Sequence, residues 1–276
     1  VTGGQLEEAQ NFSKERHDPH EVRYERANEF ADVVMGLWDG FDEDALLYDK
    51  ESGRFFDAAK IRHLNHKGKY FQVKGPLNVA RSPQGRPIVI QAGGSDKTVE
   101  MGGRIADVIF TAQPDFEAAR EFYDEIKQGT AAFGRSPDSI RVMPGLCVFT
   151  GETRDEAWAK FNALHDMVDV QDAIEGLERL LGGVDLSGFD PHGPMPELEA
   201  NDLRKSGPGS FTRLGRENNY TLAQVAIHAK AARNHCLIVG SAKEVADHME
   251  HWFRNGAADG FNPVSYTHLR AHETRI

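Results

Sequence analysis

Short apolar runs alternate with amphipathic segments along most of this chain, and that alternation limits the folds it can adopt. Residues 86–92, 106–111 and 140–150 are predicted strands, and the first is a continuous apolar run of the kind buried on both faces of a sheet. A helix running to about Arg104, another over 116–133 and a long one over 153–181 are predicted after them. Strands and helices in alternation are typical of a parallel α/β sheet or barrel.

The remaining segments flank this alternation. Helices are predicted over residues 6–16 and 22–37, followed by a polar, irregular stretch over 38–69. Residues 182–219 are rich in Gly, Pro, Asp and Asn, and a loop of that length in a compact domain is usually functional or disordered. A helix over 222–232, a short apolar piece over 236–239, and a helix opened by Ser241 and Glu244 with capping-box spacing come next. A final strand is predicted to start at residues 259–262.

Composition excludes some classes of function. With 276 residues the chain can form one large domain or two small ones. Its 43 acidic residues outnumber its 32 Lys and Arg, which argues against a nucleic-acid or anionic-membrane surface. No apolar stretch approaches the roughly 20 residues of a membrane span. Cys147 and Cys236 each lie in an apolar run, so we expect buried free thiols and a reducing cytoplasmic location.

The two ends indicate a piece of a longer protein. The chain begins at Val1 without an initiator Met, as though cut at the end of a strand. Its last residues match one reading frame of a common sequencing adapter. We therefore assign residues 1–262 to the folded domain and exclude 263–276 as read-through.

The best local candidate for a binding site is the turn of Gly93, Gly94 and Ser95. A strand that runs into glycines and a Ser opening a helix presents backbone N–H groups and the positive end of the helix dipole to an anion. The Ser95 hydroxyl can also donate to a phosphate oxygen. The alternative is that the glycines only form a turn and Ser95 only caps the helix.

A second cluster lies at the start of the second helix. His17, Asp18, His20 and Glu21 could hold a metal, but Asp18 and Glu21 are also ordinary first-turn residues next to a Pro, and we favour that interpretation over metal binding. His20 and Tyr24 are four residues apart, so they share one helix face and can reach one ligand, although such pairs often only pack. No nucleophile elbow, Walker loop or Gly-x-Gly-x-x-Gly fingerprint occurs.

Several of these segments together resemble one enzyme family. They are Val1-Thr2 and residues 20–30, 49–55, 66–71, 75–78, 81–87, 91–95, 106–113 and 256–262. In this order they resemble the bacterial luciferase-like flavin monooxygenases, in particular the subfamily of nitrilotriacetate and dibenzothiophene-sulfone monooxygenases. The resemblance covers essentially residues 1–262.

The resemblance implies a TIM-type (β/α)8 barrel that binds FMN. The chain would run from the end of the fourth strand to the eighth, with a long insertion near 182–219 as a substrate-shaping lid. In this family a His and a Tyr four residues later contact the flavin, and the Ser after the fifth strand holds its phosphate. These roles fall on His20, Tyr24 and Ser95, with Gly94 in the phosphate turn and Thr2 near the flavin ring.

The implied reaction uses reduced FMN and O₂, through a C4a-hydroperoxyflavin, to oxygenate a small organic substrate. A separate NAD(P)H:flavin reductase would supply the reduced FMN, and the longer parent would form a homo-oligomer. No residue can be named as the catalytic acid or base, and we expect this piece to be inactive by itself. Two alternatives stay open: a deazaflavin-dependent oxidoreductase on the same barrel, and a non-catalytic flavin-binding fragment.

Overall fold

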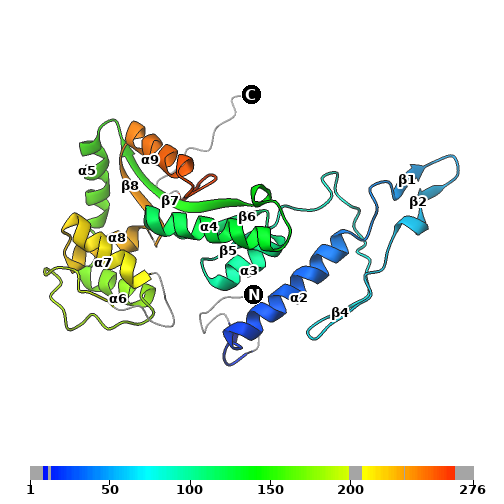
Figure 1. Ribbon diagram of the computed structural model, residues 1–276, viewed down its shortest axis with the longest axis horizontal. Coiled ribbons are helices and arrows are strands. Elements are labelled where there is room, and N and C mark those ends of the chain that lie inside the picture. The colour runs from blue at the N-terminus through cyan, green and yellow to red at the C-terminus, as the bar shows by residue number, and fades with distance from the viewer. Residues whose placement is uncertain (1–8, 12–13, 199–206, 233, 265–276) are drawn as a thin grey trace. The chain divides into compact units, whose positions relative to one another are not determined.

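The computed structural model describes residues 9–11, 14–198, 207–232 and 234–264, and it divides into two compact units (Figure 1). The first unit comprises Val1–Ile88 and the second Val89–Ile276. None of the helices in the described ranges is long and apolar enough to span a bilayer.

The first unit is built around one helix and two small hairpins. Helix α2 (His20–Trp38) confirms the helix predicted over 22–37. Strands β1 (Leu46–Asp49) and β2 (Arg54–Phe56) pair antiparallel, as do β3 (His66–Lys67) and β4 (Gln72–Val73), and a 3₁₀ turn (Ala58–Lys60) lies between the hairpins. The stretch predicted as irregular over 38–69 therefore contains short strands.

Glu29 of α2 ties the second hairpin to the helix. Its carboxylate accepts hydrogen bonds from the backbone N–H groups of Tyr70 at 3.0 Å and Phe71 at 2.8 Å, and lies 3.0 Å from Nε2 of His66. These bonds hold the pKa of Glu29 below its usual value although partial desolvation opposes them. The Glu29 side chain thus accepts the hydrogen bonds of two backbone N–H groups in the turn that links β3 to β4.

The second unit is a five-stranded parallel sheet covered by helices (Figure 1). Its strands are β5 (Ile90–Ala92), β6 (Val108–Thr111), β7 (Arg141–Gly151), β8 (Cys236–Ser241) and β9 (Asn262–Val264). The order is β5-β6-β7-β8, and β9 also pairs with β7. The parallel α/β class predicted from the sequence is confirmed.

The long strand β7 organises this sheet. It pairs with β6 over its first four residues, with β9 from Gly145 to Cys147, and with β8 from Leu146 to Gly151. Because β8 and β6 pair with successive parts of β7, the start of β8 lies at the level where β6 ends. Residues just before β8 can therefore meet residues just after β6.

Most helices of the second unit pack on the sheet, and the others pack on a neighbouring helix. They are α3 (Asp96–Ile105), α4 (Phe116–Ala132), α5 (Arg154–His165), α6 (Val170–Leu180), α7 (Gly207–Asn218), α8 (Leu222–Ala232) and α9 (Ala242–Arg254), and a 3₁₀ turn (Pro137–Ser139) precedes β7. Ile109 and Val142 of the sheet pack against Phe122 and Ile126 of α4. The capping box of Ser241 and Glu244 at the start of α9 is confirmed.

Four details differ from the sequence-based expectations. The single helix expected over 153–181 is broken into α5 and α6, because the side chain of Asp169 accepts a hydrogen bond from the Asp172 N–H and starts a new helix. Residues 14–16 are not helical, although Ala9 and Gln10 are; residues 6–8, 12 and 13 of that predicted helix lie outside the described residues.

The other two differences concern burial and the insertion. Ile90 of β5 is 64% exposed rather than buried on both faces, because β5 is an edge strand paired only with β6. The predicted loop over 182–219 contains α7. Phe211 of that helix is buried in a cluster with Leu177 and Val225, so tertiary packing stabilises a helix in a segment of low helix propensity.

Candidate functional site

The turn between β5 and α3 requires glycine at its first position. Gly93 has a φ of +154°, and a Cβ there would lie 2.2 Å from Oγ1 of Thr98. Only glycine fits both constraints. The Gly93 N–H still donates to the Phe110 carbonyl at 3.0 Å, so the sheet ladder continues up to the turn.

Ser95 occupies the N-cap position of α3 but its side chain does not cap the helix. The hydroxyl makes no hydrogen bond to the helix backbone and instead lies 3.3 Å from Oγ1 of Thr98. The residue is exposed. The Ser95 side chain therefore does not cap the helix and is accessible to a ligand, and phosphate binding at this turn stays a prediction.

Two buried polar residues lie beside the turn at the end of β6. A Cβ on Gly94 would lie 3.5 Å from Oγ1 of Thr111 and 4.0 Å from Nε2 of Gln113, an ordinary contact that leaves room for a small side chain. Gln113 donates to Thr111 Oγ1 at 3.1 Å, and both residues are at most 8% exposed. The turn thus adjoins a preorganised pair of polar side chains at the carboxyl ends of two parallel strands.

His20 and Tyr24 share one face of α2, as their spacing predicted. Their ring centroids are 4.8 Å apart at an interplanar angle of 45°, with His20 exposed and Tyr24 only 8% exposed. The pair belongs to the first unit, whereas Gly94 and Ser95 belong to the second, so a site shared by all four stays a prediction. Thr2 lies outside the described residues.

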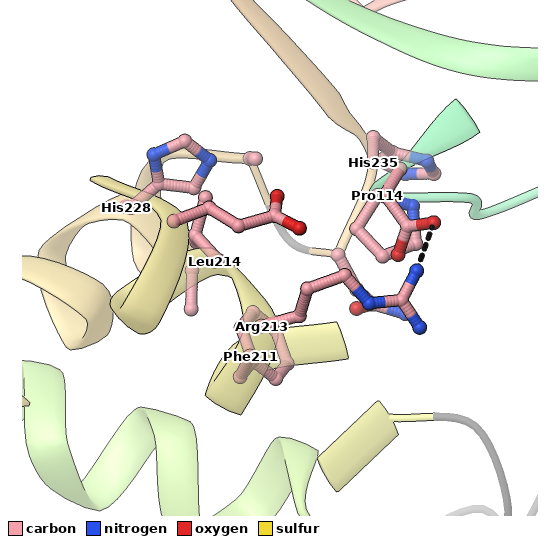
Figure 2. A pocket seen from close by; sticks show the side chains of 11 residues that line it. Pro114, Phe211, Arg213, Leu214, His228 and His235 are labelled. Atoms are coloured by element: carbon pink, nitrogen blue, oxygen red, sulfur yellow. Dashed lines mark hydrogen bonds and ion pairs between the residues drawn. The ribbon is translucent and has the colours of Figure 1, made fainter. Parts of the chain in front are cut away.

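Sequence reasoning did not find a small polar cavity of the second unit (Figure 2). It holds about 60 Å³ between the end of β6, the start of β8, and helices α7 and α8. Asp115 caps α4 and lies 3.3 Å from a guanidinium nitrogen of Arg213 on α7. Oδ2 of Asp115 and Oδ1 of Asn234 are buried and have no hydrogen-bond partner in the described part of the chain.

Burial also sets the charge of His228 in this cavity. Desolvation, with a smaller contribution from nearby His165, lowers the pKa of the His228 ring to about 4, so the ring is neutral at pH 7. Asp115 and Arg213, which meet here, are 98 positions apart in sequence, and no spacing pattern could have indicated their contact. Within the described ranges, no group of three or more His, Cys, Asp and Glu side chains is placed to hold a metal ion.

Known proteins similar to this chain share one family. Residues 1–259 match the family described as luciferase-like monooxygenase. The N-acetyl-S-(2-succino)cysteine monooxygenase of Bacillus subtilis (strain 168) is 42% identical over 95% of this chain and 60% of its own length. Nitrilotriacetate monooxygenase component A of Aminobacter aminovorans is 41% identical over 95% of this chain and 58% of its own.

A solved structure agrees with these relatives. The crystal structure of a riboflavin lyase, with modified FMN and riboflavin bound, superposes with a TM-score of 0.75 at 31% identity, over 95% of this chain and 57% of that one. The chain thus spans about 60% of the length of the curated relatives it matches. From the parallel α/β sheet, the extent of the match and these identities, we conclude that the chain belongs to the luciferase-like monooxygenase family.

Proposed function

We propose that the protein carrying this sequence is an FMN-dependent monooxygenase. Reduced FMN, when bound, supplies two electrons to O₂, so that one oxygen atom enters a small organic substrate and the other leaves as water. Membership of a family of monooxygenases supports this proposal, as does the flavin in the structurally similar riboflavin lyase. The proposed fold of the whole protein is the eight-stranded barrel, of which residues 1–262 would form the later part.

The observation that carries the proposal is the state of the Ser95 hydroxyl. It lies at the start of α3, exposed and without a bond to the helix backbone, where the helix dipole favours an anion. In this position it would donate a hydrogen bond to a phosphate oxygen of FMN. The lack of a side chain at Gly93 and Gly94 lets the phosphate approach the backbone.

The chain's other residues would position the flavin and exclude water. Thr111 and Gln113 form a rigid, buried wall beside Gly94 that limits where a ligand can lie. His20 and Tyr24, whose rings are already in contact, would bind the flavin from α2. Preorganised contacts of this kind lower the entropy lost on binding.

A separate NAD(P)H:flavin reductase is the proposed source of reduced FMN. The relative from Aminobacter aminovorans is named as component A, which indicates a system of more than one protein. None of the sequence patterns typical of dinucleotide binding occurs in this chain. We further propose that the whole protein is a homo-oligomer.

The test is FMN binding by wild type and by Ser95→Ala, measured by quenching of flavin fluorescence for oxidised FMN and by anaerobic calorimetry for reduced FMN. Loss of one charge-assisted hydrogen bond should weaken binding by about 1–3 kcal/mol, roughly 5- to 150-fold. Ser139→Ala, a serine of the turn before β7, is the matched control and should bind as wild type does. Absence of FMN binding, or binding of a deazaflavin in its place, would overturn the proposal.

Oxygenation itself is tested in the longer protein that contains this sequence. With an added flavin reductase, NADH and ¹⁸O₂, one labelled oxygen atom should appear in the product and one in water. Product formation without label from O₂ would exclude a monooxygenase even if FMN binds.

A further inference from the structure

A pocket on the first unit collects basic side chains in an otherwise acidic chain. The chain carries a formal net charge of −11. The pocket, of about 300 Å³, is lined among others by Lys14, Asp18, Arg23, Arg26, Phe30 and Phe71. All of these residues belong to the first unit.

The positive charge of the pocket is only partly balanced. Lys14 forms an ion pair with Asp18, the pocket's only carboxylate among the lining residues that the structure describes. Across the described part of the chain, no carboxylate lies within ion-pair distance of the guanidinium of Arg23 or of Arg26. Among the described residues, these two guanidinium groups, one helical turn apart on α2, have no counter-charge in contact.

Arg23 shows most clearly what the pocket lacks. Its Nε is buried and has no hydrogen-bond acceptor among the residues that the structure describes. Leaving a buried charged donor unsatisfied is costly, so an acceptor from a ligand would be bound favourably. The planar fork of a guanidinium matches the oxygens of a carboxylate or phosphate.

The walls of the pocket are aromatic. The rings of Phe30 and Phe71 have centroids 6.0 Å apart, and Phe30 is 55% exposed. The Arg26 guanidinium lies 5.4 Å from the centre of the Phe71 ring. This cation–π contact holds the guanidinium beside the aromatic wall, while Arg26 stays exposed.

We propose that this pocket binds a small organic anion, with its carboxylate or phosphate group on Arg23 and Arg26 and its planar or apolar part against Phe30 and Phe71. The volume is at the lower end of the range of small-molecule sites, about 300–1,000 Å³, which suits a compact ligand. The residues that line this pocket differ from those of the turn at Ser95.

Binding is tested by calorimetry with the 276-residue chain and three probes. Phthalate and phenyl phosphate are both aromatic dianions. Comparing their affinities shows whether the pocket prefers a carboxylate or a phosphate group. Inorganic phosphate has the charge without the ring. At least one aromatic probe should bind more tightly than inorganic phosphate.

Four variants locate the binding. Arg26→Gln removes an exposed guanidinium of the pocket and should weaken binding of the aromatic probe at least about tenfold. Arg23→Lys keeps the charge but loses the planar fork of the guanidinium, and should also weaken binding of the aromatic probe. Phe30→Ala should weaken binding of the aromatic probes and leave the affinity for inorganic phosphate unchanged. Arg54→Gln makes the same charge change as Arg26→Gln on an exposed arginine of β2, and should have no effect.

Three results would overturn the proposal. Equal weakening by Arg26→Gln and Arg54→Gln would mean that only net charge matters. Failure of every probe to bind to wild-type protein with a native circular-dichroism spectrum would exclude the site. Displacement of the bound probe by FMN, with the same stoichiometry, would assign the pocket to the flavin site instead.

Discussion

The ammonium of Lys127 on α4 lies 2.9 Å from the carboxylate of Asp259, which follows α9. The same carboxylate accepts hydrogen bonds from the Tyr123 hydroxyl at 3.0 Å and the Val142 N–H at 2.8 Å. Its side chain is only 11% exposed, and that of Lys127 is 13% exposed. One aspartate therefore joins α4, β7 and the segment that leads into β9.

Replacing Asp259 by Asn should destabilise the second unit by about 3 kcal/mol. The change leaves the Lys127 ammonium in a largely buried position without its counter-charge, which costs more than the loss of an exposed ion pair. Urea unfolding measures the effect. Asp247→Asn, which breaks the exposed pair with Lys243, is the control and should cost less than about 1 kcal/mol. Similar losses for both variants would contradict the prediction.

Gly93→Ala should lower the stability of the second unit and weaken FMN binding. The new Cβ would lie 2.2 Å from Thr98 Oγ1, at a φ that side-chain-bearing residues rarely adopt, so the turn carrying Ser95 must move. We expect a loss of more than about 1 kcal/mol in urea unfolding. Gly134→Ala is the control, because Gly134 has a φ of +72° with open space around it. It measures the cost of backbone strain without a steric clash. If the two variants behave alike, the contact with Thr98 has no role.

Stability should fall as the pH decreases from about 6.5 to 4, in part because of His228. Burial lowers the pKa of this ring to about 4, below its ordinary value of 6.5, so between these values the unfolded chain binds more protons than the folded one. The contribution is roughly 3 kcal/mol, present above pH 6.5 and lost by pH 4. The free energy of unfolding, measured with urea at several pH values, should depend less on pH between about 4 and 6.5 in His228→Gln than in wild type. His192→Gln, which replaces an exposed histidine, should leave this dependence unchanged. An unchanged acid limb in His228→Gln would show that the ring is protonated in the folded protein.

Both cysteines should resist thiol reagents while the protein is folded. Cys147 and Cys236 are free and buried, as their apolar surroundings predicted. Burial raises the pKa of the Cys236 thiol to about 12, so almost no reactive thiolate exists at pH 8. Ellman's reagent should detect neither thiol in native protein and both in 6 M guanidinium. Rapid labelling of the native protein would mean that the β7–β8 region opens.

Local patterns were sufficient to predict several elements. Helix α8 spans the residues predicted from apolar spacing, and the Ser241–Glu244 capping box forms as expected. The turn of Gly93, Gly94 and Ser95 could also be predicted, because a strand, two glycines and a Ser at a helix start are adjacent in sequence; anion binding there stays a prediction. The shared face of His20 and Tyr24 follows from the period of the helix alone.

Other features depend on contacts between distant residues. Helix α7 forms because Phe211 is buried among α6 and α8, and its composition alone predicted a loop. The exposure of Ile90 follows from the edge position of β5, which no apolar run can indicate. The pairing of Arg213 with Asp115 joins residues 98 positions apart.

The amino-acid sequence by itself determined the parallel α/β class, most helices, the turn at Ser95 and the resemblance to flavin monooxygenases, since each rests on neighbouring residues or on motifs in order. Only the tertiary structure decided which way the Ser95 hydroxyl turns, which guanidinium groups lack a counter-charge in contact among the described residues, and how far the His228 ring is removed from solvent. Those properties depend on solvent access and on partners brought together by folding. The energy of a buried charge or donor is set by such surroundings, and spacing along the chain does not encode them.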